Sequence, residues 1–438
     1  MRRWAAGWLF AGLLAGADGA GPPLHRAAYE DDLAAVERLL RGGADVKEAN
    51  RYGVTALSLA CTNGNGAMVA RLLAAGADAN TALPGGETAL MTAARSGSVE
   101  AVRALLGKGA DVKARESKYG QTALHWAAAE GHADVIGELV KAGAVVEDRL
   151  DSGYTPLLFA VREGRIAAVK ALLQAGAEVN DTTPVGGRRT APAKSPRQGT
   201  SALLLATLNA HYELGRVLLD AGANPNADGP GYTALHAVTW VRKPGLGDND
   251  PAPEGSGELT SLEFVKALVA KGADINARMS KKIGVGLTGL NTAGGTAFFL
   301  AARTADAELM RLLARLGADT KLGNVDGSTP LMAAAGLGTR SPGEDAGTEA
   351  EVMEAIAVAL ELGNDIDAVD QNGETAMHGA AYKNLPGAVR LLAKRGAKRE
   401  IWDRKNRFGW TPMRIAEGYR FGNYKPSDVT MAAFRELE

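Results

Sequence analysis

The six histidines have the clearest potential for chemistry in this chain, since imidazole serves as a general acid or base and as a zinc ligand. Four of them follow a recurrent Thr or Pro by three residues, and two follow a recurrent Thr or Ser by ten residues. The first group is His25, His125, His236 and His378, and the second is His132 and His211. Because every histidine belongs to a repeated position, none remains for a catalytic or metal site, and we expect no enzymatic activity.

The single cysteine and one glycine-rich stretch are the other candidates for chemistry. Cys61 occupies a position that Ala94 and Ala128 hold in neighbouring segments, so we interpret it as a small buried apolar side chain. One cysteine also excludes an intramolecular disulfide and a clustered Cys–His zinc pattern. Residues 284–289 resemble a phosphate-binding loop in composition only, because the flanking strand and helix of such loops are missing from the pattern. The sequence therefore predicts no cofactor and no metal.

The composition is that of a soluble folded protein. Of the 438 residues, 46% are hydrophobic and 23% are charged, and the formal net charge is -1. This balance gives no general attraction to nucleic acid or to an anionic membrane. Aromatic residues make up only 5% while glycines number 55, so the core must consist of Leu and small residues. Closely packed helices joined by tight turns suit this composition.

The elements that carry these residues repeat along the chain. Similar segments align on Thr55, Thr88, Thr122 and Thr155 at a nearly constant spacing, and each Thr is followed at a fixed distance by a Gly-Ala pair. The same register includes Pro22 before them and Ser201, Thr233, Thr296, Thr329, Thr375 and Thr411 after them, which makes eleven units. Spacings longer than this common period indicate inserted loops, each too short to fold alone.

Each unit reads as two short helices. The recurrent Thr is a helix N-cap, and the Pro or Ala after it takes the first helical position. In the second half of a unit, apolar residues such as Met68, Val69, Leu72 and Leu73 recur at helical spacing. The following Gly ends that helix. Because such a short helix pair cannot bury its apolar face alone, the units must stack.

This pattern resembles the ankyrin repeat, whose signature is a 33-residue period with Thr-Pro-Leu-His. Thr-Ala-Leu-His at 122–125 and 233–236 matches it, and Ala-Asp-x-Asn recurs at 77–80 and 273–276. The resemblance covers residues 22 to about 438. It implies an all-α ankyrin-repeat solenoid of about eleven helix-turn-helix units with protruding, β-hairpin-like finger turns, in which the histidines brace turns by hydrogen bonding.

Four inserts interrupt the register, near residues 181–199, 241–258, 278–294 and 337–350. The first and third extend finger turns, and the other two separate the helices of a unit, so we expect them at opposite ends of the helices. The finger inserts are basic and the inter-helix inserts lean acidic. The basic residues are Arg188, Arg189, Lys194, Arg197, Arg278, Lys281 and Lys282. Two interpretations stay open: a basic edge that attracts an acidic partner, or solvated loops without a specific role.

The resemblance also implies where a partner binds, because ankyrin ligands usually contact the finger tips and the exposed end of the first helix. The candidate binding residues in these positions are Tyr52, Tyr119, Tyr154, Tyr232 and Trp410 in fingers and Arg162 and Trp240 on first helices. Aromatic and Arg side chains often anchor interfaces. Alternatively, the rings pack against neighbouring fingers, and the insert after Trp240 folds back over it.

The first twenty residues differ from the repeats. Arg2 and Arg3 precede an apolar stretch over residues 4–14 and then small residues, which is the layout of a secretory signal peptide. We expect residues 1–20 to be this signal, cleaved after Ala17 or Ala20. The alternative is an uncleaved anchor. Residues 21–438 are expected to form a single array in which 411–438 is the C-terminal cap.

Together these features predict a non-catalytic scaffold that mediates protein–protein binding after export to a periplasm or the cell exterior. The expected partner is a protein, with no nucleic acid and no membrane contact after signal cleavage, and we expect a monomer. The alternative function is a membrane-anchored or secreted effector that acts on a host protein.

Overall fold

The computed structural model describes residues 22–183, 198–245, 252–284, 288–422 and 424–438. The chain divides into two compact units, residues 1–189 (unit 1) and 190–438 (unit 2). Residues 1–20, where the signal peptide is expected, lie outside the described residues. The expectation of one array rather than two stays a prediction.

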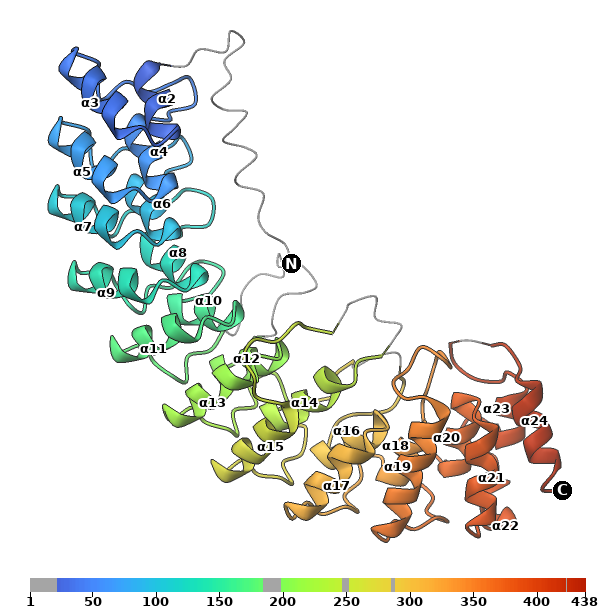
Figure 1. Cartoon of the computed structure of the whole chain (residues 1–438). Coiled ribbons are helices and arrows are strands. Elements are labelled where there is room, and N and C mark those ends of the chain that lie inside the picture. Colours follow the sequence, from blue (N-terminus) through green and yellow to red (C-terminus); the bar gives the residue numbers. More distant parts are fainter. Residues whose placement is uncertain (1–21, 184–197, 246–251, 285–287, 423) are drawn as a thin grey trace. The chain divides into compact units, whose positions relative to one another are not determined.

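Unit 1 holds five helix pairs in its described residues. They are α2 (Pro23–Tyr29) with α3 (Leu33–Arg41), α4 (Ala56–Asn63) with α5 (Gly66–Ala74), α6 (Ala89–Ser96) with α7 (Val99–Gly107), α8 (Ala123–Glu130) with α9 (Ala133–Lys141), and α10 (Pro156–Arg162) with α11 (Ile166–Gln174). Figure 1 shows these pairs following one another from blue to green. First helices pack on first helices, and second helices pack on second helices.

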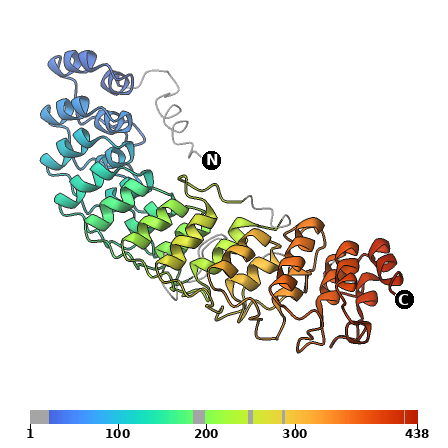
Figure 2. The same ribbon diagram turned by 60° about the horizontal axis from the view of Figure 1, so that its bottom comes forward.

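Unit 2 holds six such pairs and one short extra helix in its described residues. They are α12 (Ala202–Leu208) with α13 (Tyr212–Asp220), α14 (Ala234–Arg242) with α15 (Ser261–Ala270), α16 (Ala297–Arg303) with α17 (Ala307–Arg315), α18 (Pro330–Ala334) with α19 (Glu349–Glu361), α20 (Ala376–Lys383) with α21 (Pro386–Lys394), α22 (Arg399–Trp402), and α23 (Pro412–Ala416) with α24 (Asp428–Arg435). Figure 2 shows the same succession within unit 2 from a second direction, in yellow-green to red.

The local chemistry of a unit is the predicted one. In α6 the Thr88 hydroxyl accepts a hydrogen bond from the backbone N–H of Met91 at 3.2 Å. Gly97 ends this helix at φ 79°, in the left-handed region that side chains resist. All residues from 89 to 94 are buried, so the first helix lies between its neighbours.

The turns between pairs are finger-like and close on themselves. In one of them the backbone N–H of Leu150 donates to the carbonyl of Tyr154, and in another the N–H of Asn406 donates to the carbonyl of Trp410. Within the described residues there is no β-strand, only three isolated bridges. The all-α expectation of paired helices with hairpin-like fingers is therefore confirmed for these residues, with five pairs stacked in unit 1 and six in unit 2.

The inserts do not keep to opposite ends of the helices, so that expectation is wrong for the last two. Thr288 of the 278–294 insert forms an antiparallel bridge with Thr339 of the 337–350 insert. The backbone N–H of Gly289 also donates to the carbonyl of Gly338 at 2.7 Å. The physical reason is the length of the loops. Helix α16 has seven residues and spans about 10 Å, and the 278–294 insert is long enough to extend along it.

Candidate functional site

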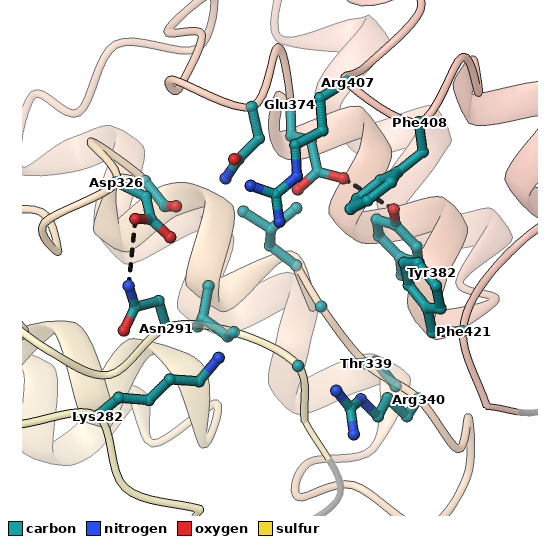
Figure 3. Close-up of a pocket in the computed structure, with 16 residues that line it drawn as sticks. Lys282, Asn291, Asp326, Thr339, Arg340, Glu374, Tyr382, Arg407, Phe408 and Phe421 are labelled. Carbon is teal, nitrogen blue, oxygen red and sulfur yellow. Dashed lines mark hydrogen bonds between the residues drawn. The ribbon is translucent and has the colours of Figure 1, made fainter.

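A pocket of about 350 Å³ opens in unit 2 where four successive finger turns meet the joined inserts (Figure 3). The fingers that precede α16, α18, α20 and α23 each contribute to its wall. The lining residues are Lys282, Gly289, Leu290, Asn291, Asp326, Ser328, Leu337, Gly338, Thr339, Arg340, Asn372, Glu374, Tyr382, Arg407, Phe408 and Phe421. Because stacking brings corresponding finger positions together, residues far apart in the sequence line one space.

A buried carboxyl group forms part of the pocket wall. Glu374 is only 7% exposed, and its Oε1 accepts hydrogen bonds from the Tyr382 hydroxyl at 2.8 Å and the Asn406 amide at 2.9 Å. Burial raises the pKa of Glu374, and it also raises the pKa of the Tyr382 phenol. These bonds fix one carboxylate oxygen in the wall, which makes this part of the pocket rigid and polar.

Three cationic side chains reach the same pocket. Arg407 enters between Asp326 and Glu374, whereas Lys282 and Arg340 come from the other side in Figure 3. The Arg407 guanidinium lies over the Phe408 ring, 4.7 Å from its centroid. All three cations are exposed, so they can meet a ligand from solvent.

Three aromatic rings cluster beside the cations. Phe408 lies 5.2 Å from Trp410 and 5.0 Å from Phe421, and Trp410 lies 5.3 Å from Phe421, measured between ring centroids. Phe408 and Phe421 keep 38% and 49% of their surface exposed. Trp410 was a sequence-predicted binding residue, whereas Phe408 and Phe421 were missed. The finger position of Phe408, two residues before Trp410, could have revealed it; Phe421 lies in the irregular last repeat and gave no such signal.

Two predicted binding rings are buried instead of displayed, which corrects their expected place on the surface. Tyr154 is 8% exposed and packs on Phe159 at 5.3 Å, and Tyr232 is 4% exposed and packs edge-on against Trp240 at 5.1 Å. The reason is that a finger ring meets the aromatic side chain of the following helix and both lose water. Trp240 lies in α14 and is half-buried.

Arg162 takes part in the same packing. Its guanidinium lies over the rings of Phe159 and Tyr154 and donates to Glu163 at 2.8 Å. Thus Tyr154 and Arg162 form one cluster on unit 1, in which the ring packs on the following helix α10 and not on a neighbouring finger as the alternative interpretation expected. Their contact with a partner stays a prediction.

Tyr52 and Tyr119 are the predicted rings that the structure leaves exposed, at 37% and 59%. Each lies under the cation of the preceding residue: Arg51 is 4.7 Å from the Tyr52 centroid, and Lys118 is 4.9 Å from that of Tyr119. These finger tips of unit 1 present a ring and a positive charge to solvent, which is a suitable anchor for a protein partner.

The predicted basic finger residues have separate roles. Arg278 donates to the carbonyl groups of Gly294 and Gly323, both at 2.8 Å, and so holds two fingers together. The side chain of Lys281 lies over Gly231, and Lys282 lines the pocket. The predicted patch residues Arg188, Arg189, Lys194 and Arg197 lie outside the described residues.

The histidines brace turns, as expected. In unit 1 the Nδ1 of His125 accepts the backbone N–H of Thr122 at 3.3 Å, so its Nε2 carries the proton and donates to the carbonyl of Asp148 at 3.1 Å. His236 and His378 make the same pair of bonds in unit 2. Burial lowers the pKa of all three to about 4, which keeps them neutral.

The remaining candidates for chemistry are the single cysteine and possible metal ligands. Cys61 is fully buried, and burial raises the pKa of its thiol to about 12, which suits the predicted apolar role. Across the described ranges, no group of three or more His, Cys, Asp or Glu side chains is arranged to hold a metal ion. The helices described also include none with the length and apolar character to cross a membrane.

Comparison with known proteins agrees with this fold of paired helices and finger turns. Residues 24–116 and 113–183 match the sequence model of the family described as "Ankyrin repeats (3 copies)". A stretch of 214 residues is 30% identical to "Neurogenic locus notch homolog protein 2" of Homo sapiens and of Mus musculus. That stretch covers 49% of this chain but only 6% of either relative.

Among solved structures, the crystal structure of the human ASB11 ankyrin repeat domain is similar at 25% sequence identity and a TM-score of 0.45. The match covers 57% of this chain and 98% of that one. The helix pairs, the finger turns and the family match together define a repeat protein made of stacked helix pairs. Residues 24–183 of this chain belong to the ankyrin-repeat family.

Proposed function

We propose that this chain is a non-catalytic scaffold that binds another protein through its finger turns and the surface of its first helices. Ankyrin repeats typically mediate protein–protein interaction, and the family is generally non-catalytic. The observation that carries the proposal is the pocket of unit 2, where finger residues from four repeats converge beside three partly exposed aromatic rings. Such a combination of rings and Arg is typical of interface anchors.

The test is a comparison of capture by matched variants. The tagged full chain is cross-linked in extracts of its source, and captured proteins are identified, purified and titrated against the chain by calorimetry. We expect the double variant Phe408→Ala/Arg407→Glu to weaken binding of the true partner at least about tenfold, since hot-spot truncations cost about 2 kcal/mol or more. Lys266→Glu, an exposed charge reversal on α15, is the control and should bind normally. Equal binding by both variants contradicts the proposed surface.

We also propose that the chain works after export. The support is the charged start, apolar stretch and small residues of positions 1–20. In the alternative, the same segment anchors the chain in a membrane, and the protein is an anchored or secreted effector. Intact-mass measurement of the native protein decides between them: loss of residues 1–17 or 1–20 supports cleavage, and retention of Met1 in a membrane fraction supports the anchor.

A further inference from the structure

The polar groups of the unit 2 pocket divide into satisfied acceptors and available cations. Asp326 accepts the Asn291 amide at 3.1 Å, and Glu374 accepts the Tyr382 hydroxyl at 2.8 Å. By contrast, within the described part of the chain neither Lys282 nor Arg340 makes a side-chain hydrogen bond or ion pair. One oxygen of each carboxylate is therefore already held by the protein, while Lys282 and Arg340 are left for a ligand.

Arg407 is the cation that the protein has positioned most firmly. Its guanidinium lies over the Phe408 ring, and its backbone N–H donates to the carbonyl of Asn372 at 2.8 Å. Stacking leaves the edge of the guanidinium plane, with its N–H groups, free to donate. A planar carboxylate matches this edge by accepting two parallel hydrogen bonds.

The charge of the pocket favours a carboxylate over a phosphate. Three cationic side chains and two carboxyl groups line it, so its formal charge is +1 when both carboxyl groups are ionised. One carboxylate neutralises this charge, whereas a phosphoryl group brings about -1.5 to -2 and would be repelled by Asp326 and Glu374. The volume of about 350 Å³ is at the lower end for ligand sites, which suits one or two side chains.

We propose that the pocket binds an Asp or Glu side chain of the partner protein, with Arg407, Lys282 and Arg340 as donors. An apolar residue beside that acid packs on Phe408 and Phe421, which line the pocket together with the cations and contact Trp410. The partner segment thus combines an acid with a neighbouring apolar side chain. This inference rests on the proposed protein-binding function and names what the partner must present.

The probes are three fluorescein-labelled peptides of sequence Gly-Ser-Phe-X-Ser-Gly, in which X is Glu, Gln or phosphoserine. Binding to the full chain is measured by fluorescence anisotropy at low salt. We expect the Glu peptide to bind at least about tenfold more tightly than the Gln peptide, because a charge-assisted hydrogen bond exceeds a neutral one. Added salt should weaken the Glu peptide selectively.

Substitutions test the cationic side chains and the aromatic rings of the pocket separately. Lys282→Gln/Arg407→Gln should abolish the Glu-over-Gln preference, and Phe421→Ala, at the exposed ring beside Phe408, should weaken both peptides by the same factor. Lys266→Gln, on the second helix of its repeat, is the matched control and should change neither. Circular dichroism melting checks that each variant is folded; all the substituted side chains are exposed.

The outcomes distinguish this inference from the proposed function. Equal binding of the Glu and Gln peptides, tighter binding of the phosphoserine peptide, or no binding at all overturns the acidic specificity. If a partner is still captured through Phe408 in any of those cases, the protein-binding function stands alone. If the Glu preference appears but no partner is captured, the pocket chemistry stands and the proposed function fails.

Discussion

Unit 1 keeps one register, with its recurrent Thr at a nearly constant spacing from Thr55 to Thr155, whereas unit 2 carries inserts in several of its repeats. In unit 1, finger tips such as Tyr52 and Tyr119 project separately into solvent. In unit 2, the insert before α16 bridges to the insert after α18, and together they frame a pocket. The difference teaches that regular repeats present individual side chains, while inserts between repeats enclose a space.

The largest expected effect concerns the buried ion pair between α16 and the 337–350 insert. Arg303 donates to Asp345 at 3.1 Å, both side chains are 4% exposed, and Asp345 also accepts the Thr339 hydroxyl. Asp345→Ala should destabilise unit 2 by about 3–5 kcal/mol, because a buried cation loses its counter-charge. Urea unfolding measures the loss, and hydrogen exchange should place it in unit 2. The neighbouring, exposed Glu344→Ala is the control. Equal loss of protection in unit 1 would contradict the separation of the two units.

The second effect tests whether a finger ring in unit 1 is structural. Tyr154→Ala should cost about 3 kcal/mol, because its ring packs on Phe159 and under Arg162. The thermal midpoint measures this loss, and calorimetry with the partner measures affinity. A large fall in midpoint with unchanged affinity means that Tyr154 is a packing residue, and a loss of affinity without a loss of stability restores it to the binding surface.

The third prediction concerns the buried turn-bracing histidines, which occur in both units. The folded pKa of His236 is about 4 and its ordinary value is 6.5, so the unfolded state binds more protons between these values. Stability is therefore complete above pH 6.5 and falls as pH drops toward 4, by about 2 kcal/mol per histidine between pH 7 and 5. His236→Met should flatten this dependence in urea titrations, since Met91 and Met332 hold the same position naturally. An unchanged pH slope would falsify the assignment.

The smallest effect on stability is expected at the exposed fingers of unit 1. Tyr119→Ala should change the free energy of unfolding by less than about 0.5 kcal/mol, because the ring is 59% exposed. Its affinity for the partner, measured by calorimetry, should nevertheless fall if unit 1 contributes to binding. Unchanged affinity would restrict the interface to unit 2 and so sharpen the comparison of the two units.

Short-range features of the sequence determined the repeat itself. A Thr cap, a closing Gly and a leucine stripe act within one helix or turn, so their spacing predicts where helices such as α6 begin and end. The resemblance to ankyrin repeats implied the turn-bracing role of His125, and its Thr122 partner is three residues away. Trp410 was also placed correctly on a finger, because it directly precedes the cap Thr411.

Only the tertiary structure decided which side chains are available and where the pocket lies. Tyr119 lies three residues before its cap Thr122, whereas Tyr154 directly precedes Thr155. The structure shows that Tyr154 meets Phe159 on the next helix and is buried, while Tyr119 is exposed. The bridge from Thr288 to Thr339 joins two inserts that share no repeat pattern. Such contacts depend on how far irregular loops reach across stacked helices, and no local periodicity encodes that path.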